Sequence, residues 1–84
     1  MNLASLVVHT RPENMEAVRT RLLDLVGVEI HGAHPQGRLV VTVEDDDEAR
    51  LADTLLRIHR EDGVVAAALV YAQREPTSDP RESP

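Results

Sequence analysis

Along the chain, segments with the apolar pattern of a strand alternate with segments that have the apolar spacing of a helix. Leu3 to Thr10 has a nearly continuous apolar centre, which is typical of a strand buried on both faces. Strands are also predicted at 28–34, at 38–44 and from Val64 to about Gln73. Between them, apolar residues recur at the three- and four-residue spacing of one helical face. They are Met15, Val18, Leu22 and Leu25 in the first segment, and Leu51, Leu55 and Ile58 in the second.

Turn and capping residues separate these elements. Thr10 and Pro12 are expected to open the first helix, because threonine can cap a helix and proline suits its first turn. Gly27 is expected to end that helix. The sequence 35–37, Pro-Gln-Gly, predicts a hairpin turn between the second and third strands. The acidic run 45–47 is expected to cap the second helix and to interact favourably with its dipole.

The order of these elements is β-α-β-β-α-β, which predicts an α+β protein with the ferredoxin-like split βαβ arrangement. Right-handed crossovers then place both helices on one face of a four-stranded antiparallel sheet with strand order 4-1-3-2. We expect one domain over residues 1–75. Residues 76–84 contain only polar, charged and proline residues, which predicts a disordered tail.

The sheet face opposite the helices, here called the open face, has no predicted cover. On the last strand, alternation directs Val65, Ala67, Leu69 and Tyr71 toward the helices. The open face also receives Glu29, His31, Arg38 and Val64. Its candidate binding residues are Ser5, Val7, His9, Val40, Thr42, Glu44, Ala66, Ala68 and Val70.

Small side chains on the last strand suggest that something packs closely against the open face. Alanine occupies positions 66–68, although it is a weak strand former. A floor of alanines and valines would leave a shallow trough for a helix or a second sheet, and a contiguous apolar surface favours a protein or peptide partner. The alternative is that exposed valines only reflect strand propensity.

Composition narrows the partner classes. A net charge of −6 without a single lysine argues against nucleic acid, which needs clustered basic residues. Acidity favours basic partners, or serves only solubility. The longest apolar run is far too short to cross a bilayer, and no secretory signal is visible, so no membrane insertion and a cytoplasmic location are expected.

Candidate chemistry is sparse. No cysteine is present, and His31 and His34 are predicted to point to opposite faces of their strand, so no metal site is expected. The carboxylates of 44–48 lack the spacing of a calcium loop, and no phosphate-binding loop is found. Ser5 has no evident base for a nucleophilic triad. We therefore expect no enzyme and no cofactor.

Four segments together resemble the NapD family over residues 3–75. They are SLVVHTRPE, GVEIHG, GRLVVTVE and DGVVAAALVYAQRE. The resemblance implies a cytoplasmic chaperone that binds the twin-arginine signal peptide of NapA, the catalytic subunit of the periplasmic nitrate reductase. It further implies that the peptide is withheld from export until the molybdenum cofactor is inserted. Ala66 and Ala68 would then floor the site for its apolar helix, and acidic groups would meet its arginines.

Two alternatives of other classes stay open at this point. A regulatory domain of ferredoxin-like fold would bind a small metabolite, usually through glycine-rich loops, but the chain has only four glycines. A small ferredoxin-like enzyme would need a pocket of polar or aromatic groups, and the chain has a single aromatic residue.

Overall fold

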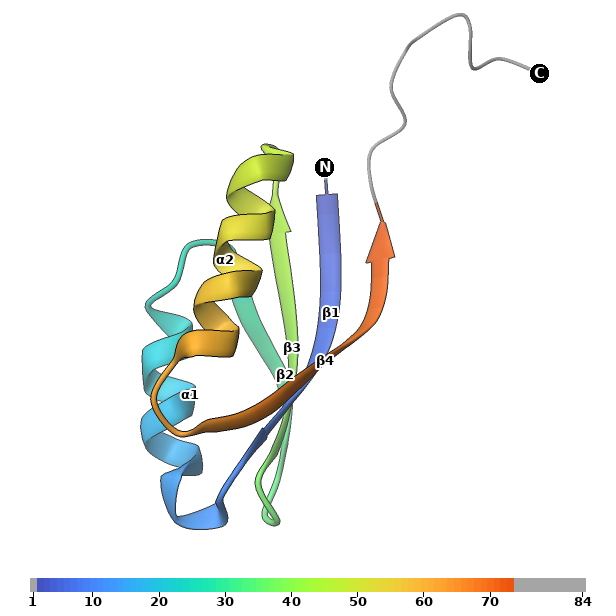
Figure 1. Cartoon of the computed structure of the whole chain (residues 1–84). Helices are drawn as coiled ribbons and strands as arrows, with labels where there is room; N and C mark the ends of the chain where they lie inside the picture. The colour runs from blue at the N-terminus through green and yellow to red at the C-terminus, as the bar shows by residue number, and fades with distance from the viewer. Residues whose placement is uncertain (1, 74–84) are drawn as a thin grey trace, which may run out of the picture.

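A computed structural model describes residues 2–73 (Figure 1). The predicted tail at 76–84 lies outside the described residues. The elements in chain order are β1 (Asn2–Thr10), a short 3-10 helix (Pro12–Asn14), α1 (Met15–Leu23), β2 (Val28–His34), β3 (Arg38–Asp45), α2 (Glu48–Arg60) and β4 (Val64–Gln73).

The sheet has the predicted topology. Its order is β2-β3-β1-β4 and every neighbouring pair is antiparallel, which is the expected 4-1-3-2 order counted from the other edge. Both helices lie on the same side of the sheet (Figure 1). The ferredoxin-like arrangement is therefore confirmed, and no helix or strand of residues 2–73 covers the second face of the sheet.

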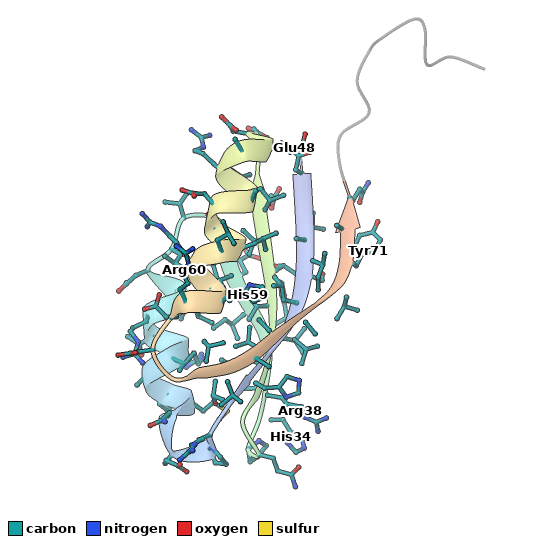
Figure 2. The ribbon with its side chains drawn as sticks, in the orientation of Figure 1. His34, Arg38, Glu48, His59, Arg60 and Tyr71 are labelled. Atoms are coloured by element: carbon teal, nitrogen blue, oxygen red, sulfur yellow. The ribbon has the colours of Figure 1, made fainter. Side chains whose placement is uncertain are left out.

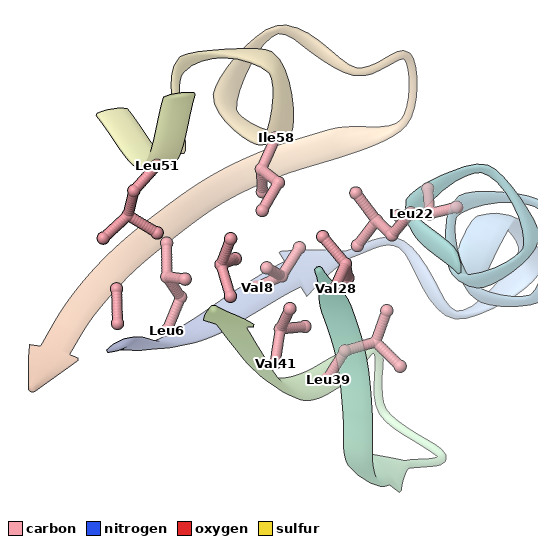
Figure 3. Close-up of a cluster of buried hydrophobic side chains, with 11 residues drawn as sticks. Leu6, Val8, Leu22, Val28, Leu39, Val41, Leu51 and Ile58 are labelled. Atoms are coloured by element: carbon pink, nitrogen blue, oxygen red, sulfur yellow. The ribbon is translucent and has the colours of Figure 1, made fainter. Parts of the chain in front are cut away.

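The core lies between the helices and the two central strands (Figure 3). On β1 and β3 every second residue is buried, as alternation predicts. The helices contribute Val18 and Leu22 of α1 and Leu51 and Ile58 of α2 to the core. The sheet contributes Ala4, Leu6, Val8, Val28, Leu39, Val41 and Val43.

Of the two predicted helix caps, one is confirmed and the other prediction is wrong. Asp47 precedes α2, and its Oδ1 accepts hydrogen bonds from the backbone N–H groups of Ala49 at 2.8 Å and Arg50 at 3.2 Å. Thr10 instead ends β1, where its hydroxyl donates to the carbonyl oxygen of Arg11 at 3.0 Å and its backbone N–H donates to that of Gly37 at 2.7 Å. Thr10 therefore joins β1 to the β2–β3 turn and does not cap the first helix.

Gly27 has a different role from the predicted helix end. α1 stops at Leu23, and Gly27 follows in the turn that leads into β2, with φ of +80°. A side chain there would strike the backbone carbonyl of Glu44, whose own N–H donates to the Gly27 carbonyl at 3.0 Å. Glycine is required here both for this backbone angle and for the close approach of β3.

Two irregularities in the pairing change which sheet face the residues near each end of β4 occupy. Its pairing with β1 skips Val65 and Val70, which are extra residues on the β4 side. Alternation is as predicted only between these two bulges, from Ala66 to Leu69. Each bulge reverses the alternation beyond it, because one added residue exchanges the two faces.

Three predictions on β4 are therefore wrong. Val64 packs against the core instead of facing away from it, because it is paired with buried Thr10. Val65, expected inside, is 67% exposed. Tyr71, also expected inside, is paired with Ser5 on the open face. Leu69 does share the helix side with Leu6 but is 55% exposed, because this half of the edge strand bends away from α2 (Figure 1).

Candidate binding face

Strand pairing aligns the open-face residues in rows that cross the sheet from β2 to β4. The arginine row contains His34, Arg38, His9 and Ala66. The apolar row contains Gly32, Val40, Val7 and Ala68. The polar row contains Glu29, Thr42, Ser5 and Tyr71. Beyond it, Glu44, Leu3 and Gln73 form the last row.

The rows place eight of the nine candidate residues together on this face. These are Ser5, Val7, His9, Val40, Thr42, Glu44, Ala66 and Ala68. The ninth, Val70, is the extra residue of a bulge and is 66% exposed. Their shared location follows from the register, while their role in binding stays a prediction.

The apolar row contains a shallow hollow of about 350 Å³. Val7 and Val40 line it, together with Gly32, Ala33, His34 and Arg38. Gly32 was not among the candidates, although an isolated glycine inside a strand signals close approach of another group. A Cβ atom at position 32 would lie 3.8 Å from Val40 Cγ2, so the absence of a side chain at Gly32 leaves space beside Val40.

The arginine row lies at one end of the open face. Figure 2 shows His34 and Arg38 together, on the side of the sheet away from the helices and at the end opposite Tyr71. The backbone N–H of Gln36 donates to His34 Nδ1 at 3.2 Å, which orients that ring. Within residues 2–73, the guanidinium of Arg38 makes no hydrogen bond and no ion pair. This end therefore carries an unpaired positive charge.

The opposite end carries Glu29 and Glu44, here called the acidic end. His31 Nε2 lies 2.6 Å from Thr42 Oγ1 and 3.7 Å from a carboxylate oxygen of Glu29. Glu44 makes no side-chain hydrogen bond or ion pair with any described residue. A carboxylate without a partner at the rim of an apolar surface is suited to bind a cation.

The histidine prediction needs correction. His31 is the extra residue where β2 pairs with β3, and its bond to Thr42 places its ring over the open face. His34 pairs with Arg38 and lies on the same face, not on the opposite one as predicted. Even so, no three histidine or carboxylate side chains of residues 2–73 gather closely enough to hold a metal ion.

Part of the acidic run is structural. Arg50 Nη2 lies 3.1 Å from Asp45 Oδ1, and Asp47 caps α2. The hydrogen bond from Arg50, followed by one from the Asp47 backbone N–H, lowers the pKa of Asp45 below its usual value. These two carboxylates already have partners, so Glu44 of the acidic end, which has none among the described residues, is better placed to meet a ligand.

The fold and the open face define the class: a small ferredoxin-like domain with an apolar surface between two oppositely charged ends. The family model described as NapD protein matches residues 1–76. The chain belongs to the NapD family.

Named relatives agree with this assignment. The chain is 35% identical over 74 residues to the chaperone NapD of Escherichia coli K12, which covers 87% of this chain and 85% of the relative. The same figures hold for the chaperone NapD of Shigella flexneri. The solution structure of the E. coli Tat proofreading chaperone protein NapD has a TM-score of 0.78 and 34% identity, and the match covers 98% of this chain and 85% of that one.

These relatives are chaperones and not enzymes, as expected for this chain. Among the described residues, no helix has the length and apolar character needed to cross a membrane.

Proposed function

We propose that this protein is a cytoplasmic chaperone for NapA that binds the twin-arginine signal peptide of its precursor on the open face. The observation that carries the proposal is the uncovered apolar row between two charged ends, in a member of a chaperone family. The solved relative is a proofreading chaperone of the Tat (twin-arginine translocation) system, which supports a signal peptide as the ligand.

The chemistry of the face matches that of such a peptide. Its apolar, helix-prone part would lie over Val7, Val40 and Ala68, with one large side chain in the hollow beside Gly32. Val40 is 46% exposed in the free protein, so apolar surface is removed from water when a helix covers it. The two arginines would meet the exposed carboxylates of Glu29 and Glu44 at the acidic end.

Binding would also control export. A signal peptide held on the sheet is withheld from the translocation machinery, so the precursor stays in the cytoplasm while the molybdenum cofactor is inserted. The chaperone needs no cofactor of its own for this role. Cells that lack it should export a larger fraction of cofactor-free NapA.

Calorimetry with a synthetic NapA signal peptide tests the proposal. The peptide should bind with a measurable Kd, and changing both arginines to glutamine should weaken binding several-fold, because exposed ion pairs contribute up to about 1 kcal/mol each. Added salt should reduce this difference but preserve the apolar part of binding. Absence of binding would refute the proposal, and equal affinity of the two peptides would refute the arginine recognition.

A matched pair of variants locates the site. Val40→Glu places a charge in the apolar row and should weaken peptide binding about tenfold, which is about 1.4 kcal/mol. Val26→Glu is the control, because Val26 is 81% exposed in the turn between α1 and β2. A similar loss of binding in both variants would show that the open face is not the site.

A further inference from the structure

We infer that the open face binds the signal helix in one direction. The arginine-bearing N-terminal end of the peptide lies over the acidic end, Glu29 and Glu44, and its C-terminal end lies over Arg38. The bound helix thus runs antiparallel to β3. This inference rests on the proposed function and adds to it the orientation of the ligand.

The main observation is the charge distribution along β3. Arg38 begins the strand and Glu44 lies six residues later, and both side chains are exposed on the open face. Neither has an ion-pair partner within residues 2–73. Six residues of strand span about 20 Å, which is the length of a helix of about 13 residues. One helix can therefore reach both charges at once.

Residues on the neighbouring strands do not offset this polarity. Beside Arg38 the arginine row contains the imidazoles of His9 and His34 and no carboxylate. Beside Glu44, Glu29 of the polar row adds a second carboxylate, with His31 at 3.7 Å as its neighbour on that strand. No arginine occurs in the polar row or in the last row. The two charged ends are thus separated by Val7, Val40 and Ala68.

A helical signal peptide has a positive N-terminal end for two separate reasons. Its arginines precede the apolar stretch, and the helix dipole places partial positive charge at the N-terminus and partial negative charge at the C-terminus. In the proposed direction both features meet an opposite charge. In the reverse direction the arginines would lie beside Arg38, and the carbonyl end of the helix would lie beside Glu44. With about two- to fivefold for each exposed charge contact, the combined preference is on the order of tenfold.

Spin-labelled peptides measure the direction. Because the protein has no cysteine, a nitroxide on a single peptide cysteine is the only label. A label at the peptide's N-terminus should broaden the amide NMR signals of Leu3 and Glu44, and a label at its C-terminus should broaden those of His9 and Arg38. The reverse pattern, or equal broadening at both ends, would overturn the inference while leaving the proposed function intact. Absence of binding by the unlabelled peptide would overturn the proposed function, and the direction with it.

A charge exchange tests the cause. The double variant Arg38→Glu, Glu44→Arg keeps the net charge and should shift the broadening from an N-terminal label toward His9. The control exchange, Glu16→Arg with Arg19→Glu, alters an exposed pair on α1 at 3.7 Å and should leave the original pattern. If the exchange on β3 also leaves the pattern unchanged, these charges do not set the direction.

Discussion

Ala67 and Ala68 are neighbours on β4 with opposite expected roles. Ala68 is paired with Val7 on the open face and is exposed, so Ala68→Leu should change the free energy of unfolding by less than about 1 kcal/mol. Ala67 is paired with fully buried Val8 and packs against the core. A leucine at position 67 should overpack that contact and destabilise the fold by about 1–3 kcal/mol.

For peptide binding the ranking should be reversed: Ala68→Leu should weaken binding more than Ala67→Leu. A leucine at position 68 raises the floor beside Val7 and lifts a docked helix from Val40. If two methylene groups of the helix lose their contacts, at about 0.8 kcal/mol each, binding weakens by about 1.6 kcal/mol. This corresponds to roughly tenfold in Kd. Ala67→Leu, on the other side of the sheet, should leave the Kd of the folded fraction almost unchanged.

Urea unfolding and calorimetry on the two variants check both parts. The two substitutions are chemically identical and adjacent, so they differ only in the face that each residue occupies. If Ala68→Leu unfolded easily while Ala67→Leu stayed stable but bound poorly, the alternation assigned to the centre of β4 would be inverted.

Three other substitutions or deletions test separate parts of the structure. Asp47→Ala should lower the free energy of unfolding by about 1 kcal/mol through loss of the α2 cap, while the neighbouring control Asp46→Ala should cost less than about 0.5 kcal/mol; equal losses in urea melts would contradict the cap. Because the pKa of Asp45 is lowered in the folded state, this carboxylate stabilises the fold above the ordinary aspartate pKa. That stabilisation is lost as the pH falls through the folded-state pKa. Asp45→Asn should therefore flatten the acid limb of stability against pH, and an unchanged limb would contradict that role. Deleting Thr77–Pro84 should preserve both stability and peptide affinity, because this segment has no apolar side chain other than proline to bury; loss of binding would place this segment in the site.

The central part of the fold follows from the sequence because alternation is unbroken there. β1 and β3 are each paired on both sides, and every buried residue on them has the predicted parity. The edge strands differ. Val65 and Val70 on β4 and His31 on β2 are extra residues in the pairing, and nothing in their identity distinguishes them from regular strand residues. A bulge depends on how two strands pair, so a single strand's pattern does not predict it.

The same bulges account for what the sequence missed on the open face. They bring Tyr71 into the polar row and His34 into the arginine row, where simple alternation placed neither. The apolar row needed no such correction, because Val7, Val40 and Ala68 lie within regular pairing. The candidate surface was thus predictable at its centre, whereas the full arrangement of its charged ends required the register.

The most direct measurement of the central claim is an NMR titration of the protein with the NapA signal peptide, followed through backbone amide shifts. Shifts should be largest in the apolar row, at Val7, Val40 and Ala68, and small on the outer surface of α1 and α2. The same titration with the arginines changed to glutamine should need several-fold more peptide. Shifts confined to the helices, or no shifts at saturating peptide, would contradict the claim that the open face is the signal-peptide site.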